Sequence, residues 1–211
     1  MSYINEILEF NQQFVVNKQY ELYKTTKFPN KKIAILSCMD TRLTELLPAA
    51  LNFRNGDIKI IKNAGATITH PFGSVMRSIL VAVYELGVEE ILVIGHHDCG
   101  MQHMEPTDLL EKMLKRGISQ EVIDGVSYYG IDVQKWLKGF ESVEDTVLET
   151  MEVIRSHPFM PKDVEVYGFI IDPETGKLTP VSSIKPEVCS DTVTNLVKRE
   201  PKDDFLWHKN K

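Results

Sequence analysis

The sequence predicts an α/β fold with a central, mostly parallel β-sheet of four strands and an added antiparallel edge strand. Helices flank this sheet, and a helical arm precedes it. Three observations lead to this prediction: short apolar runs recur along the chain, segments of helical period separate them, and a strong turn follows the last run. Strands that alternate with helices build a largely parallel sheet, because each helix carries the chain back to the start of the next strand.

The first predicted element is an N-terminal helical arm over residues 1–26. Its apolar residues are spaced as on one face of a helix, and they include Ile4, Ile7, Leu8, Phe14, Val15 and Leu22. This spacing indicates one or two amphipathic helices.

Four apolar runs predict the parallel strands. They cover residues 33–36, 58–61, 90–95 and 164–171. Strands buried on both faces read as nearly continuous apolar runs rather than as alternating patterns. Asp172-Pro173-Glu174-Thr175-Gly176 then predicts a tight turn, so residues 177–181 are expected to return antiparallel to the fourth strand.

Helical patterns fill the intervals between these strands. Residues 74–86 are apolar over most of a helix circumference, which is typical of a helix buried in a core or in a subunit interface. Residues 101–141 combine four glycines with short helical patterns and predict a helical excursion from the sheet. Ser142, with Asp145 three residues later, predicts the start of a helix that ends before Pro158.

The remaining segment, residues 185–211, is polar and is expected to form a loosely held C-terminal tail. We expect residues 1–211 to form a single domain, because their number suits one compact core.

Composition narrows the class of protein. Lys and Arg number 24 against 30 Asp and Glu, a net charge of 24 − 30 = −6, so the chain as a whole does not attract nucleic acid or an anionic membrane. Three cysteines are too few for a disulfide scaffold. The N-terminus lacks the pattern of a signal peptide, and the longest apolar run, residues 79–84, is too short to span a membrane. These features predict a cytoplasmic protein, in which cysteines serve more often as metal ligands or nucleophiles than as bridges.

Two thiols and an imidazole stand at the ends of predicted strands. Cys38 follows the first strand, and His96 and Cys99 follow the third. Ligands of open α/β sheets bind at the carboxyl ends of strands, so these side chains meet if the two strands are neighbours. Two cysteines and a histidine form a known zinc ligand set, and three protein ligands with an open fourth position are typical of catalytic zinc. The sequence therefore predicts a catalytic Zn²⁺ site.

Asp40 and Arg42 follow directly after Cys38 and predict the catalytic pair of that site. Two thiolates neutralise the charge of Zn²⁺, so the metal acidifies its bound water less than it would with three neutral histidines. A nearby base is then useful. Arg42 can hold the Asp40 carboxylate in a bidentate grip, and Asp40 can accept the hydrogen of a zinc-bound hydroxide.

Three ordered motifs resemble those of the β-class carbonic anhydrases, in particular the short microbial branch of that family. They are Cys38-x-Asp40-x-Arg42, Asn63-Ala64-Gly65 and His96-x-x-Cys99-Gly100, and the resemblance covers roughly residues 30–182. The chain departs from the family's usual pattern at Lys62, where arginine is common. It also lacks the glutamine that plant-type members carry shortly before the first metal strand.

The resemblance implies a function and a set of roles. Zn²⁺ would be held by Cys38, His96 and Cys99, and zinc-bound hydroxide would attack CO2 in the reversible formation of bicarbonate and a proton. Asp40 and Arg42 would form the catalytic dyad. In the family, the aspartate either pairs with the arginine (open state) or binds zinc (closed state). Gly65 and Gly100 would line the substrate pocket.

The resemblance also implies the partners. The small molecules CO2 and bicarbonate would be the only ligands besides the metal, without nucleic acid or membrane. Subunits would pair, as a homodimer or a dimer of dimers. The broad apolar circumference of residues 74–86 favours that segment as the dimer interface.

Alternative interpretations remain open at this stage. Cys38 and Cys99 would be ordinary buried cysteines in a protein without a metal. His97 competes with His96 as the ligand, but the His-x-x-Cys spacing favours His96, so His97 is interpreted as a supporting or core histidine. Asp98 is a catalytic candidate, but it is interpreted as a turn residue that follows a strand. Cys189 is interpreted as a free cysteine, and His70 and His103 are candidate proton shuttles.

Two alternative functions use the same residues. One is a non-catalytic protein that binds zinc or senses bicarbonate. The other keeps the catalytic site but hydrolyses CS2 or COS. Which of these molecules reaches the zinc would depend on the access tunnels and the assembly of the protein.

Overall fold

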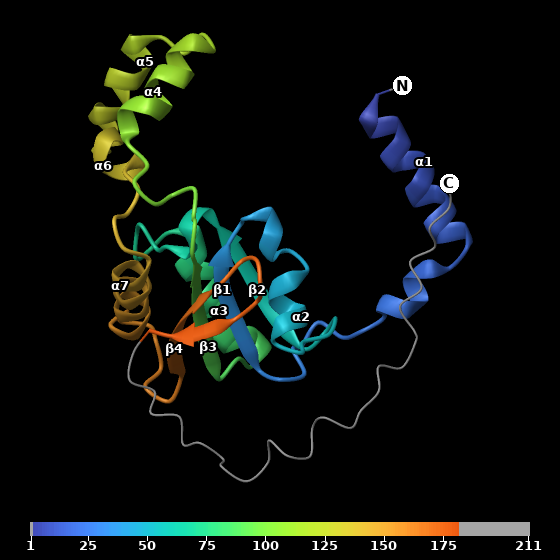
Figure 1. Cartoon of the computed structure of the whole chain (residues 1–211). Coiled ribbons are helices and arrows are strands. Elements are labelled where there is room, and N and C mark those ends of the chain that lie inside the picture. The colour runs from blue at the N-terminus through green and yellow to red at the C-terminus, as the bar shows by residue number, and fades with distance from the viewer. Residues whose placement is uncertain (1, 182–211) are drawn as a thin grey trace.

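The computed structural model describes residues 2–181, and the predicted tail 185–211 lies outside this range. A five-stranded sheet forms its centre (Figure 1). The strands are β1 (Ile33–Cys38), β2 (Ile58–Asn63), β3 (Glu90–His96), β4 (Glu165–Ile171) and β5 (Leu178–Pro180). Their order across the sheet is β2-β1-β3-β4-β5, with β5 antiparallel to β4 and all other pairs parallel. The predicted fold class is confirmed.

The turn between β4 and β5 forms as the sequence predicts. The Oδ1 atom of Asp172 accepts hydrogen bonds from the backbone N–H groups of Glu174 (2.9 Å) and Thr175 (2.8 Å). Gly176 has a φ of +72°, which glycine adopts without strain. The chain therefore reverses within a few residues and adds β5 as the edge strand.

Two helices cover one face of the sheet. They are α3 (Ser74–Leu86) and α7 (Val143–Arg155). The buried sheet residues on this face are Ala34, Leu36, Ile91, Val93, Val166 and Ile170. The helices bury Met76, Ile79, Ala82, Val143, Val147, Met151 and Ile154 against them. Ser142 caps α7 by accepting a hydrogen bond from the N–H of Asp145 at 3.2 Å, as predicted.

The apolar stripe of α3 is in part a core surface. Met76 and Ile79 are fully buried within the chain itself, and the face away from the sheet exposes Val81 and Tyr84. The sheet therefore covers part of the stripe, and the role of this segment in a dimer interface stays a prediction.

The opposite face of the sheet is covered by short elements. These are the 3₁₀ turn η2 (Thr41–Leu43) and helix α2 (Leu46–Ala50). Their Leu43 and Leu47 are fully buried and pack with Ile35 and Ile94 of the central strands. The two cysteines Cys38 and Cys99 belong to the same apolar cluster.

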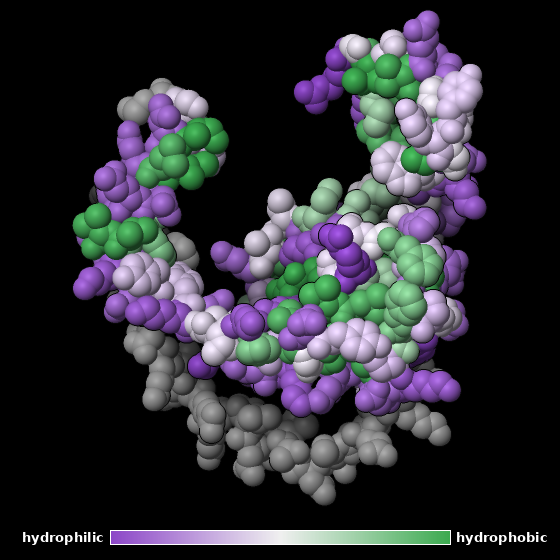
Figure 2. All heavy atoms as spheres, turned by 180° about the vertical axis from the view of Figure 1, so that it is seen from behind, coloured by the Kyte–Doolittle hydropathy of each residue, from purple (hydrophilic) through white to green (hydrophobic). Residues whose placement is uncertain are grey.

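The N-terminal arm consists of α1 (Tyr3–Val16) and the 3₁₀ helix η1 (Gln19–Tyr23), and it stands apart from the sheet (Figure 1). No residue of α1 is buried. Figure 2 shows apolar side chains gathered on this arm; the most exposed of α1 include Tyr3, Ile4, Leu8, Phe10 and Val16.

The predicted helical excursion projects at the other end of the molecule (Figure 1). It contains α4 (Pro106–Lys115), α5 (Gln120–Gly125), η4 (Val126–Tyr129) and α6 (Val133–Leu137). Two short segments join it to the body side by side: the N–H of His103 donates to the carbonyl of Phe140 (2.8 Å), and the N–H of Gly139 donates to that of Met104 (2.9 Å). Among residues 2–181, no helix has both the length and the apolar character needed to cross a membrane.

Glycines on β3 and β4 allow α7 to approach the sheet closely. A Cβ atom on Gly95 would lie 2.8 Å from Cγ1 of Val143. A Cβ atom on Gly168 would lie 2.8 Å from Cγ1 of Val147 and would overlap Sδ of Met151. Because α7 and β4 are both part of the core, neither can retreat without loss of packing.

We expect Gly168→Ala to lower the free energy of unfolding by about 1–3 kcal/mol, the usual cost of overpacking a core. Gly125→Ala is the matched control, because Gly125 lies in α5 with no atom near a new Cβ. Alanine there should leave stability equal or slightly higher. Urea denaturation measures both variants, and equal stability of Gly168→Ala and the wild type would contradict the packing argument.

Candidate metal centre

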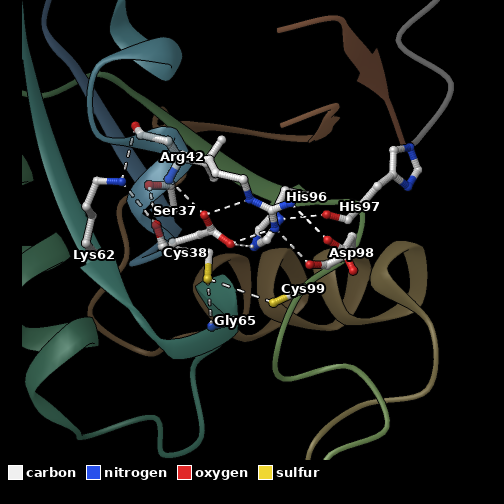
Figure 3. Close-up of polar contacts among 11 residues, drawn as sticks. Ser37, Cys38, Arg42, Lys62, Gly65, His96, His97, Asp98 and Cys99 are labelled. Carbon is white, nitrogen blue, oxygen red and sulfur yellow. Dashed lines mark hydrogen bonds and ion pairs between the residues drawn. The ribbon is translucent and has the colours of Figure 1, made fainter. Parts of the chain in front are cut away.

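Three buried side chains that can bind metal meet at the ends of two neighbouring strands. Cys38 ends β1, His96 ends β3, and Cys99 follows β3 by three residues. Their ligand atoms all lie within 4.8 Å of one another, and the two sulfur atoms are 3.9 Å apart. Figure 3 shows the side chains of Cys38 and Cys99 turned toward each other. The structure therefore brings together the three predicted ligands in a group that can hold a metal ion.

The imidazole of His96 has one nitrogen held by the backbone and the other free to bind. Its Nδ1 lies 2.8 Å from the carbonyl oxygen of His97 and must donate, because a carbonyl only accepts. The neutral ring then has a lone pair on Nε2, which is buried and has no hydrogen-bond partner among residues 2–181. A buried polar atom left without a partner is costly unless a ligand binds it.

The pKa values of the two thiols shift in opposite directions. Contact with the thiol of Cys99 lowers the pKa of Cys38, and the N–H of Gly65 supports the thiolate at 3.4 Å from Sγ. The same contact raises the pKa of Cys99, and burial adds to this effect. One thiolate is thus stabilised before any cation arrives, and a bound cation would deprotonate the second thiol as well.

Asp40 and Arg42 form a bidentate ion pair beside these donors. The Oδ1 atom of Asp40 accepts from the backbone N–H (2.9 Å) and from Nε (3.0 Å) of Arg42, and its Oδ2 accepts from Nη2 (2.8 Å). These hydrogen bonds lower the pKa of Asp40 to about 2. Oδ2 also lies 3.9 Å from Nε2 of His96, so the carboxylate stands next to the metal-binding group.

The site opens to the surface through a cavity of about 670 Å³. Its walls are Cys38, Met39, Asp40, Thr41, Arg42, Ala64, Cys99, Gly100 and Met101. Of the two glycines predicted to line the substrate pocket, Gly100 lies in the wall of this cavity, and its role toward a substrate stays a prediction. Gly65 instead lies behind Cys38, in the turn η3 (Ala64–Ala66), with a φ of +78°. A Cβ atom there would lie 2.9 Å from Cε1 of Phe140, so the turn needs glycine for both its conformation and its packing.

Comparison with known proteins agrees with this geometry. A family model described as carbonic anhydrase matches residues 33–178. The chain belongs to the β-class carbonic anhydrase family. The family resemblance that the motifs predict is thereby confirmed.

Similar proteins include both carbonic anhydrases and an enzyme with a different name. The Bacillus subtilis (strain 168) protein called "Putative carbonic anhydrase YtiB" is 59% identical over 84% of this chain and 95% of its own. The crystal structure of β-carbonic anhydrase isoform I from Trichomonas vaginalis matches with a TM-score of 0.78 and 37% identity, covering 86% of this chain and 98% of that one. The carbon disulfide hydrolase of Acidithiobacillus thiooxidans is 32% identical over 82% of this chain and 88% of its own.

Lys62 stands where the family often has arginine, and the structure gives it a defined role. Its Nζ donates to the carbonyl oxygens of Cys38 (3.1 Å) and Leu43 (3.4 Å). These carbonyls bracket the loop that carries Asp40 and Arg42, so the lysine ties both ends of that loop to β2 (Figure 3). Burial lowers the pKa of Lys62.

Asp98 makes a contact at this site that the sequence does not predict. Interpreted as a turn residue, it does lie in a bend, with a φ of +53°. Its Oδ2 also accepts a hydrogen bond from Nη1 of Arg42 at 2.9 Å, and its carbonyl oxygen accepts one from Nη2 at 3.0 Å. The sequence shows only that Asp98 stands next to Cys99. It does not indicate which basic side chain pairs with the Asp98 carboxylate.

His70, His97 and His103 lie outside the cavity wall. His97 contributes its backbone carbonyl to His96, while its side chain is exposed. His70 accepts from the N–H of Phe72, and His103 pairs with Glu141 at 2.8 Å. Their predicted role as proton shuttles stays a prediction. Cys189 lies outside the described residues.

The Asp40–Arg42 pair should make stability depend on pH in a defined window. The pKa of Asp40 is about 2 in the folded protein and about 3.9 in an unfolded chain. The pair's stabilisation is therefore complete above the unfolded value and is lost as the pH falls from about 4 toward 2.

We expect metal-free Arg42→Gln to unfold at lower urea concentration than metal-free wild type near pH 5. This difference should shrink as the pH approaches 2. Arg77→Gln, at an exposed position of α3, is the control and should show no such trend. A difference between Arg42→Gln and wild type that stays constant from pH 5 to pH 2.5 would contradict the assignment.

Proposed function

We propose that this protein is a zinc-dependent carbonic anhydrase that interconverts CO2 and bicarbonate. The observation that carries the proposal is the buried Nε2 of His96, which has no hydrogen-bond partner within residues 2–181 and lies beside two thiols, with the Asp40–Arg42 pair at its edge. Membership of the β-class carbonic anhydrase family supports the same reaction.

The donor set fits zinc. Thiolate sulfur and imidazole nitrogen are the ligands that Zn²⁺ prefers, and sites with three protein ligands keep a position open for chemistry. The group within residues 2–181 has three donors rather than four, which favours a catalytic over a structural metal. When bound, zinc supplies a Lewis acid that makes water a nucleophile near neutral pH.

Asp40 and Arg42 prepare the open position. Because Arg42 engages both carboxylate oxygens, Asp40 is held beside the donors rather than among them. Its low pKa keeps it ionised at neutral pH, so it only accepts hydrogen bonds. It can thus orient an attacking water and accept its hydrogen. This arrangement corresponds to the open state that the family resemblance implies.

Ala64, Gly100 and Met101 offer little polar side-chain surface to a substrate. A small linear molecule without a dipole, such as CO2, suits such a wall, and bicarbonate leaves through the open cavity. Hydrolysis of CS2 or COS is the second candidate, favoured by the 32% identity to a carbon disulfide hydrolase. The third is a non-catalytic zinc or bicarbonate sensor with the same ligands.

The expected setting of the enzyme follows from composition and exposed surface. We propose a cytoplasmic location, because three cysteines are too few for the disulfide scaffold typical of small secreted proteins. We also propose a homodimer or dimer of dimers. The exposed apolar side chains of α1, together with Val81 and Tyr84 on α3, support subunit pairing.

The metal and the reaction are tested together. We expect about one zinc ion per chain, lost on Cys38→Ser, His96→Ala or Cys99→Ser, because each removes one of three ligands. Cys189→Ser is the matched control and should retain zinc. Metal analysis gives the content, and stopped-flow assays give CO2, COS and CS2 turnover of the same samples. Full zinc content in Cys99→Ser would refute the ligand set, and zinc without any turnover would indicate the sensor.

The dyad is tested by removing each charge in turn. Asp40→Asn should lower kcat for CO2 hydration by about 10²-fold or more, because the amide cannot take a hydrogen as a base does. Arg42→Ala should also lose most activity, for the opposite reason: the freed carboxylate can bind the metal itself. Both variants should keep zinc. Near-wild-type turnover of Arg42→Ala would show that the dyad argument is wrong.

A further inference from the structure

One guanidinium serves two carboxylates at this site. Arg42 gives Nε and Nη2 to Asp40, Nη1 to the carboxylate of Asp98, and Nη2 also to the carbonyl of Asp98. Figure 3 shows Arg42 reaching from the Cys38 loop to Asp98, next to Cys99. The arginine thus bridges the two loops that carry the cysteines.

The backbone at Asp98 is suited to this contact. Its φ of +53° is unusual for residues other than glycine, although aspartate and asparagine tolerate it. This conformation lets both the side chain and the carbonyl of one residue face the same guanidinium. Asp98 is 85% exposed at its side chain, so this geometry is not a consequence of burial.

We propose that Asp98 is a positioning residue that holds Arg42 in place and thereby keeps Asp40 away from the metal position. The inference rests on the proposed function, because it concerns the open state of that site. Asp98 does not touch the donors' open position and acts only through Arg42.

Competition between the two carboxylates does not reverse this effect. Asp98 binds Nη1, which Asp40 does not use, so the two acids occupy different N–H groups of the fork. The negative charge of Asp98 weakens the field of Arg42 at Asp40, but solvent screens a charge that is 85% exposed. Asp98 therefore affects the Asp40–Arg42 pair more by restricting the arginine side chain than by weakening its field.

Without the Asp98 carboxylate, Arg42 keeps Asp40 and a single carbonyl as partners and gains freedom to move. Asp40 then leaves the arginine more often and becomes a fourth protein ligand of the metal. Two consequences follow together: turnover falls, and the metal is held more firmly. If the substitution only disturbed the structure of the loop that carries Cys99, the metal would be bound less firmly.

The test uses full-length Asp98→Gly and Asp98→Asn. Glycine removes the side chain without straining the positive φ, and asparagine keeps an acceptor at the same place. We expect Asp98→Gly to lower kcat for CO2 hydration about two- to five-fold with KM little changed, the size expected for a partly exposed ion pair. Asp98→Asn should recover at least half of the loss. Asn52→Gly, at an exposed φ of +56°, controls for glycine at such a position and should match wild type.

Zinc release provides a readout that does not depend on activity. With excess chelator, release from Asp98→Gly should be slower than from wild type by a similar factor. The slowing should vanish in the Asp40→Asn background, where no carboxylate remains to bind the metal.

Two results would overturn the inference. One is unchanged kcat and unchanged zinc release in Asp98→Gly. The other is faster zinc release that persists in the Asp40→Asn background, which would mean that Asp98 only shapes the Cys99 loop. A wild type that binds zinc but hydrates no CO2 would refute the proposed function instead, and the release experiment would still decide the role of Asp98.

Discussion

The parallel pairing of β1 with β3 is the constraint on which the rest of the site depends. Its register sets Ser37 opposite Ile94, so Cys38 and His96 emerge from adjacent strands at the same edge of the sheet. Both strands are buried along nearly their whole length. A slip of register would move their apolar side chains out of the core and separate the ligands at once. The stability of the core and the geometry of the site therefore have one origin.

The two faces of the sheet are covered by different kinds of element. Helices α3 and α7 cover one face, and Gly95 and Gly168 let α7 lie against the strands. The second face is covered only by short elements such as η2 and α2, which follow β1 directly. The loop that begins at Cys38 can thus carry Asp40 and Arg42 back across the strand ends, with Lys62 holding its two ends.

The charges around the donors are arranged in layers. Two cysteines and a histidine lie innermost and buried, Asp40 lies next to them, and Arg42 and Asp98 lie outside. Arg42 holds Asp40, and Asp98 holds Arg42, through hydrogen bonds of 2.8–3.0 Å. Electrostatic interactions strengthen as water is excluded, so the Asp40–Arg42 pair, with its less exposed carboxylate, is stronger than the Arg42–Asp98 pair.

Local patterns in the sequence were sufficient for the strands, the antiparallel edge, the cap of α7 and the grouping of Cys38, His96 and Cys99. Each of these features depends on residues close together in the sequence or on the rule that parallel strands end at one edge. The family motifs gave further support to the grouping of the three ligands. Tertiary structure alone decided which residues of the α3 stripe face the sheet, since helical periodicity cannot say what covers an apolar face. It also decided that Gly65 supports Cys38 from behind rather than lining the cavity, and that Asp98 meets Arg42 across 56 positions of the chain. Contacts between residues so distant along the chain depend on how loops cross after the strands have paired, and no short-range pattern encodes that.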